Sequence, residues 1–140
     1  MTDTTRLTSA PPVVDQVNAH TFRATKAATF EAAHFMGHVA QGHPYKNLHG
    51  HSFRVEVTVI GQAQAGEGWV QDFDQITAAL DQATAELDHS LLNEVPGLET
   101  PTLEMLCVWF SRRLKPALPG LTAVEVSRPS LGERVLLELR

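Results

Sequence analysis

The sequence has a single cysteine, Cys107, so no disulfide can form within the chain. Aromatic residues make up only 6% of the 140 residues, and Tyr45 is the one tyrosine. No apolar run approaches the roughly 20 residues that a membrane-spanning helix needs, which argues against a membrane partner. Lysine and arginine number 11 against 16 acidic residues, for a net charge of −5, and form no basic patch. Nucleic-acid binding is therefore not expected.

The length and composition fit one domain with a single core. Residues 1–18 are rich in Thr, Ser and Pro and read as a loose N-terminal leader, which leaves residues 19–140 for the folded domain. The leader has no charged-then-apolar signal pattern, so the predicted location is the cytoplasm.

Hydrophobic periodicity predicts four strands and two helices. Side chains alternate along the strand candidates, and apolar residues recur at helical spacing in the helix candidates. Asp72 and Thr102 are candidate N-caps. The predicted strands cover residues 21–34, 51–61, 121–129 and 133–140, and the helices lie within 72–89 and 101–118.

The order β-β-α-α-β-β predicts an α+β fold, with a four-stranded antiparallel sheet and two helices on one face. The other face and the sheet edges are left without a partner, so we expect a homo-oligomer.

Five of the seven histidines fall between positions 34 and 51. His49 and His51 are two apart at the start of a strand, so their side chains point to the same side. If the first two strands form a hairpin, His34 lies beside them and completes a set of three imidazoles, a common catalytic zinc arrangement. The alternative is that these are surface or capping histidines. His38 and His43 are expected to be solvated loop residues.

Asp88 and His89 follow the first helix. The histidine could act as a general acid or base if the aspartate holds its tautomer. Adjacent side chains do not easily hydrogen-bond to each other, however, and the dipeptide alone is more typical of a helix end.

Five ordered motifs carry a more specific signal: FEAAHF, LHGHSF, GWVQDF, LDHSLLN and PGLETPTLEML. In order and spacing they resemble the 6-pyruvoyltetrahydropterin synthase and 6-carboxytetrahydropterin synthase family, and the last motif is most similar to the queuosine-biosynthesis branch. The resemblance implies the tunnelling fold, in which sheets of several subunits join into a barrel. It also implies hexamers with active sites between subunits, and Zn²⁺ held by His34, His49 and His51.

The implied substrate is 7,8-dihydroneopterin triphosphate, whose side-chain hydroxyls bind zinc so that the adjacent C–H becomes acidic. Triphosphate then leaves, and the bacterial branch goes on to cleave the side chain. The resemblance implies that Asp88 and His89 relay protons, together with groups from a neighbouring subunit. It places Thr102 and Glu104 near the pterin pocket, although both also suit helix capping.

Two positions depart from the family pattern. The general-base cysteine, four residues before HGH, is Tyr45 here, and a phenol loses its proton at a higher pH than a thiol. Cys107 is expected to be a core residue. The glutamate that anchors the pterin ring is Arg128, which donates hydrogen bonds where a carboxylate accepts them. Glu125 should face the other side of the strand, and Glu133 could replace the anchor only if the strand turn rearranged.

The favoured hypothesis is a zinc-dependent lyase that acts on dihydroneopterin triphosphate or a related heterocycle by proton abstraction and elimination or side-chain cleavage. Tyr45 would occupy the base position and Arg128 the ring-recognition position. The alternative is a non-catalytic zinc-bearing oligomer that binds a carbonyl-rich or anionic small molecule.

Overall fold

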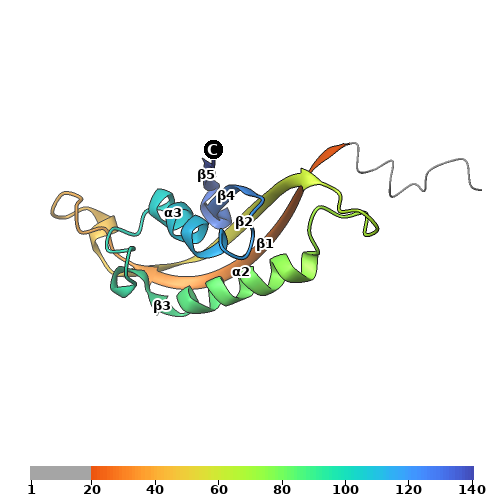
Figure 1. The fold of residues 1–140 in the computed structure, drawn as a ribbon. Helices are drawn as coiled ribbons and strands as arrows, with labels where there is room; N and C mark the ends of the chain where they lie inside the picture. The colour runs from red at the N-terminus through yellow and green to blue at the C-terminus, as the bar shows by residue number, and fades with distance from the viewer. Residues whose placement is uncertain (1–19) are drawn as a thin grey trace, which may run out of the picture.

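The fold is known from a computed structural model that describes residues 20–140; the predicted leader at residues 1–18 lies outside them. The architecture is α+β, as predicted, with two α-helices and one sheet (Figure 1). The strands are β1 (Thr21–His34), β2 (His49–Gln62), β3 (Ser90–Leu91), β4 (Leu121–Arg128) and β5 (Glu133–Glu138). The helices are α2 (Phe73–Leu87) and α3 (Leu103–Leu114).

The sheet has the strand order β3-β1-β2-β4-β5, so it contains five strands and not the predicted four. The extra strand, β3, is two residues long and pairs in parallel with the end of β1. The β1–β2, β2–β4 and β4–β5 pairs are antiparallel. Figure 1 shows the long β1–β2 hairpin curving through the molecule, with α2 alongside it and α3 near β4 and β5.

Both helices begin at the predicted caps. The Asp72 carboxylate accepts from the N–H of Asp74, and the Thr102 hydroxyl accepts from the N–H of Met105. Each bond satisfies a backbone donor that the first helical turn leaves free. The prediction of the helix starts from capping residues is therefore confirmed.

Alternation along the strands determines which side of the sheet is buried. Val55, Val57 and Val59 of β2 are fully buried and join the buried residues of both helices in one core. Residues of the other parity, such as Thr25 and Thr58, face away from the helices, and their hydroxyls hydrogen-bond to each other at 3.0 Å. Within residues 20–140, helices therefore cover one face of the sheet and leave the other uncovered.

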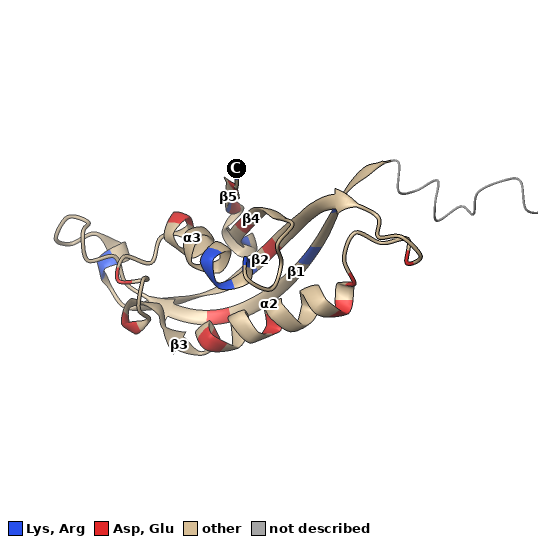
Figure 2. Ribbon diagram, in the orientation of Figure 1, with Lys and Arg blue, Asp and Glu red and all other residues tan. Residues whose placement is uncertain are grey.

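Charged residues are distributed without a basic stripe along any described element. Acidic segments recur along α2, whereas basic segments are scattered over several elements (Figure 2). No helix within residues 20–140 is long and apolar enough to span a bilayer.

Candidate functional site

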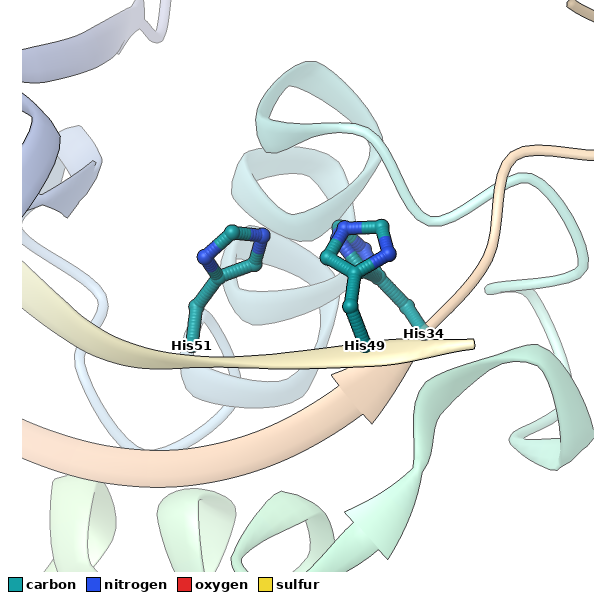
Figure 3. Close-up of side chains that lie close together, drawn as sticks. All are labelled: His34, His49 and His51. Carbon is teal, nitrogen blue, oxygen red and sulfur yellow. The ribbon is translucent and has the colours of Figure 1, made fainter. Parts of the chain in front are cut away.

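Three histidines converge at the open end of the β1–β2 hairpin. His34 is paired with His49 across the two strands, and His51 follows on the same side of β2. Their candidate ligand atoms all lie within 4.8 Å of one another. Figure 3 shows the three rings rising from the same side of the hairpin. The predicted juxtaposition of His34, His49 and His51 is therefore present.

Backbone carbonyls orient two of the three imidazoles. His34 Nδ1 lies 3.1 Å from the carbonyl oxygen of Pro101, and His49 Nδ1 lies 2.7 Å from that of Asn47. A carbonyl only accepts, so in both rings Nδ1 carries the hydrogen and donates it. In the neutral rings, each Nε2 then presents a lone pair.

The remaining ring nitrogens fit a metal cation. His34 Nε2 and His49 Nε2 are 3.0 Å apart, and two facing lone pairs at that distance need a positive charge between them. His51 Nε2 is buried and has no hydrogen-bond partner. Buried polar atoms are normally satisfied, so this atom points to a ligand. Three imidazole nitrogens form a donor set that suits zinc.

Burial favours the neutral form of two of these imidazoles, His34 and His51. Burial lowers the pKa of His34 from 6.5 to about 4, and the neighbouring imidazoles and Arg128 contribute to the lowering. Burial, followed by the charge of Arg128, also lowers the pKa of His51. Neutral imidazole is the metal-ligating form, so at neutral pH neither ring must lose a proton before it binds a cation.

A cavity of about 640 Å³ opens beside the histidine cluster, within the size range of small-molecule sites. Tyr45, Arg128, Thr102 and Glu104, all predicted site residues, lie in its wall. Thr102 and Glu104 also sit at the start of α3, as its cap and in its first turn, so the capping interpretation and the pocket-lining interpretation both hold.

The loop between β1 and β2 holds Tyr45 at the cavity. The Tyr45 N–H donates to His43 Nδ1, and its carbonyl accepts from the N–H of Met36. Lys46 Nζ donates to the carbonyls of Gly37 and Val39, both at 3.0 Å, and closes the loop on itself. His38 and His43 are exposed loop residues, as expected, and both also line the cavity. Counting residues back from the HGH motif could not have revealed that these loop residues line the cavity.

Asp88 and His89 form a pair, contrary to the expectation for adjacent side chains. His89 has a left-handed backbone, with φ of 58°, and its Nδ1 lies 3.0 Å from Asp88 Oδ2. The other carboxylate oxygen accepts from the N–H of Glu31, and these hydrogen bonds lower the pKa of Asp88. Asp88 also terminates α2, so the pair is both a helix end and a base with its orienting group.

This pair does not share the histidine cavity. His89 lines a second hollow of about 520 Å³ with Ala33, Gly50 and Ser52, and His51 also borders it. Ala33, Gly50 and Ser52 alternate along β1 and β2 with the three clustered histidines, so they face the opposite side of the sheet, where His89 lies beside them. Within one chain, the two groups of predicted catalytic residues are separated by the β1–β2 hairpin.

The position of Glu133 differs from the expectation. It is paired with Arg128 directly across the β4–β5 hairpin and lines the same cavity, without any rearrangement of the turn. Gly132 makes this possible, because its φ of 67° lies in the left-handed region that closes the turn. Glu125 faces the other side, as expected, and contacts Arg134 at 3.7 Å.

Cys107 is expected to resist thiol reagents in the folded protein. Its side chain is buried and its thiol donates to the carbonyl of Val135, and burial raises its pKa to about 11. The thiolate is the reactive form, so Ellman's reagent at mildly alkaline pH should label the native chain negligibly and label it fully in guanidinium. Rapid labelling of the native chain would show that the thiol is accessible and could serve as a base.

Comparisons with known proteins agree with the geometry of the site. The family model described as 6-pyruvoyl tetrahydropterin synthase matches residues 23–135. A "dihydroneopterin monophosphate aldolase" of Pyrococcus furiosus is 37% identical over 76% of this chain and 84% of its own length. A 6-carboxy-5,6,7,8-tetrahydropterin synthase of Synechocystis is 41% identical over 72% of this chain and 81% of its own length. The solved 6-pyruvoyl tetrahydropterin synthase of Caenorhabditis elegans has the same fold, with a TM-score of 0.76 at 18% identity over 86% of this chain and 97% of that one.

Proposed function

Because the chain belongs to the 6-pyruvoyl tetrahydropterin synthase family, we propose that it is a zinc-dependent lyase acting on 7,8-dihydroneopterin triphosphate or a closely related pterin. The observation that carries the proposal is the convergence of His34, His49 and His51 beside a cavity large enough for a bicyclic ring. The unpartnered His51 Nε2 and the close pair of Nε2 atoms on His34 and His49 support a bound cation.

The three histidines would hold Zn²⁺ through Nε2, and the carbonyls of Pro101 and Asn47 would keep two of the rings in the correct tautomer. When bound, zinc polarises hydroxyl and carbonyl oxygens and makes a neighbouring C–H more acidic. His34 is buried, and electrostatic interactions are stronger where bulk water is excluded.

Proton transfer is assigned to Tyr45 and to the Asp88–His89 pair. Tyr45 lies in the cavity wall, with its ring centroid 6.5 Å from that of His49. Asp88 accepts from His89 Nδ1, so His89 Nε2 carries the lone pair that can take up a proton. Asp88 remains ionised, which stabilises the imidazolium that forms.

The separation of these groups by the sheet requires a second copy of the chain in each site. His89 is on the opposite face from the cavity, and its side chain is 80% exposed. A neighbouring subunit that places its His89 against the cavity of this one would complete the site. The sheet face without helices and the unpaired edge of β5 are available for this assembly, which we propose is a homohexamer in the cytoplasm.

The decisive experiment is incubation of the zinc-loaded protein with dihydroneopterin triphosphate and, separately, with dihydroneopterin monophosphate. We expect a new pterin product with at least one of them, together with release of triphosphate or of a side-chain aldehyde. The monophosphate is included because the Pyrococcus relative is named as an aldolase for it. No product and no released fragment with either compound would contradict the proposed function.

Replacing Tyr45 with phenylalanine tests the residue that occupies the position of the family cysteine. We expect turnover to fall by about 10²-fold or more, because an acid–base group contributes roughly that factor, while zinc content stays unchanged. The substitution removes only the hydroxyl, so the backbone bonds to His43 and Met36 should persist. Turnover equal to that of the unchanged protein would remove Tyr45 from the mechanism.

A second candidate is a non-catalytic zinc-bearing oligomer that binds a small molecule. The observation in its favour is the phenol of Tyr45 where the family has a thiol. Thermal-shift measurements with pterins, dioxo-heterocycles and carboxylates would distinguish the two. Stabilisation by the latter two and not by pterins would favour this candidate.

A further inference from the structure

An arginine and a glutamate lie side by side in the wall of the histidine cavity. Arg128 ends β4 and Glu133 begins β5, and they face each other across the turn at residues 129–132. Strand alternation puts both on the cavity side of the sheet, in the same rows as Val126 and Val135. The charges of the pair cancel, so the cavity wall does not present an uncompensated cation at this position.

The contact between the two side chains leaves hydrogen-bonding capacity on each. Arg128 Nη2 lies 2.8 Å from Glu133 Oε2. Nevertheless, Arg128 Nε and Glu133 Oε2 are both buried and neither has a hydrogen-bond partner, so the contact is an ion pair and not a well-formed hydrogen bond. The Arg128 side chain is only 19% exposed. A buried donor without a partner, beside a carboxylate oxygen whose one contact lacks hydrogen-bond geometry, is costly unless a ligand supplies the missing hydrogen bonds.

We propose that Arg128 and Glu133 together select the ring of the substrate by a cyclic amide edge, in which a carbonyl oxygen stands next to an N–H. The Arg128 guanidinium would donate to the carbonyl oxygen, and the Glu133 carboxylate would accept from the adjacent N–H. A pterin carries such an edge on its pyrimidine ring. This inference rests on the proposed function and names the chemical feature that its site reads.

The position of the pair relative to the metal cluster fits this role. Arg128 and Glu133 line the same cavity as His34 and His49. A ring held at Arg128 and Glu133 would therefore direct its substituent toward the metal ligands. Arginine alone would leave the N–H groups of a pterin unpaired; Glu133 supplies the missing acceptor from the neighbouring strand.

Binding of three unreactive rings tests the proposal. Pterin and lumazine both contain the amide edge, whereas 2,4-diaminopteridine has an amino group in place of the carbonyl. Fluorescence titration of the zinc-loaded protein at neutral pH should give similar affinities for the first two. The affinity for the third should be at least about tenfold weaker, because its ring has neither the carbonyl oxygen that Arg128 would bind nor the adjacent N–H that Glu133 would accept from. Equal binding of all three rings would overturn the proposal.

Variants assign the discrimination to these residues. Arg128→Met should reduce the preference for pterin over 2,4-diaminopteridine, because only the Glu133 contact would then distinguish them, and Glu133→Gln should weaken pterin binding by about tenfold. The matched controls are Arg113→Met and Glu86→Gln, which break the ion pair between α3 and α2 far from the cavity and should leave the preference unchanged. If Arg128→Met keeps the full preference, the pair has only a structural role.

Two safeguards keep the result interpretable. The preference is a ratio of affinities, so it does not depend on the fraction of a variant that is folded, and Arg128→Lys serves if the methionine variant does not fold. Lysine keeps the charge but lacks the planar guanidinium, so its preference should also fall. These rings lack the reactive side chain, so their binding is measured independently of turnover. If the unchanged protein shows no preference, ring selection is refuted and the lyase activity is unaffected. If it shows the preference but no turnover, only the lyase activity is refuted.

Discussion

Replacing His51 with alanine is expected to abolish zinc binding and leave the zinc-free fold almost unchanged. Even loss of a hydrogen-bond partner of a metal ligand weakens binding by about 10–100-fold, so loss of a ligand should exceed that range. In the chain without metal, His51 Nε2 makes no hydrogen bond, so the substitution breaks none at that atom. Zinc should therefore raise the melting temperature of the unchanged protein, but not that of the variant.

Metal analysis after dialysis and thermal unfolding with and without chelator measure the two effects. His20→Ala is the matched control, because His20 is exposed and lies away from the cluster, and it should retain full zinc content. If the His51 variant binds zinc as tightly as the control, the three histidines are not the metal centre. The assignment of the activity would then lose its main support.

Replacing His89 with alanine is expected to lower turnover by about 10²- to 10⁴-fold without changing zinc content. The imidazole is largely exposed in the single chain, and its known partner is the Asp88 carboxylate, so its loss should hardly affect stability. Steady-state rates and metal analysis of the purified variant provide the measurement. A variant that retains normal turnover would exclude His89 from the proton relay.

Mixing experiments extend this prediction to the assembly. His51→Ala disables the metal side of the hairpin and His89→Ala disables the opposite side. If one site takes its metal from one subunit and its relay from another, co-expression of the two variants should restore part of the activity that each lacks. Co-expression of His49→Ala with His51→Ala is the control and should restore none. Equal inactivity of both mixtures would contradict a shared site.

The helices and the long strands could be predicted because their signals are local. Capping residues and periodic apolar positions lie within each element, and both predicted N-caps make their expected bonds. Strand β3 could not be predicted in this way, because two residues have no measurable period. Its pairing with β1 depends instead on the tertiary contact that places residues 90–91 beside residues 32–33.

The clustering of the three histidines could be predicted from the sequence, and the pocket around them only in part. Spacing two apart on a strand placed His49 and His51 together, and a hairpin brought in His34. The role of Glu133 depended on the register of the β4–β5 turn, which Gly132 sets through a left-handed backbone. Treating residues 129–132 as a four-residue turn would have paired Glu133 with Arg128. The contact between Asp88 and His89 required the unusual backbone of His89, for which the sequence carries no evident signal.

The carbonyls that orient His34 and His49 also limit how far this centre can be transplanted. Pro101 belongs to a segment 67 positions after His34, and Asn93 holds that region against the end of β1 through both the N–H and the carbonyl of Phe35. A designer who grafted only the hairpin onto a foreign scaffold would copy three imidazoles but lose the Pro101 acceptor that fixes the ring of His34. A graft that keeps the orientation of His34 must therefore combine two separate segments of the chain, the hairpin and residues 93–101.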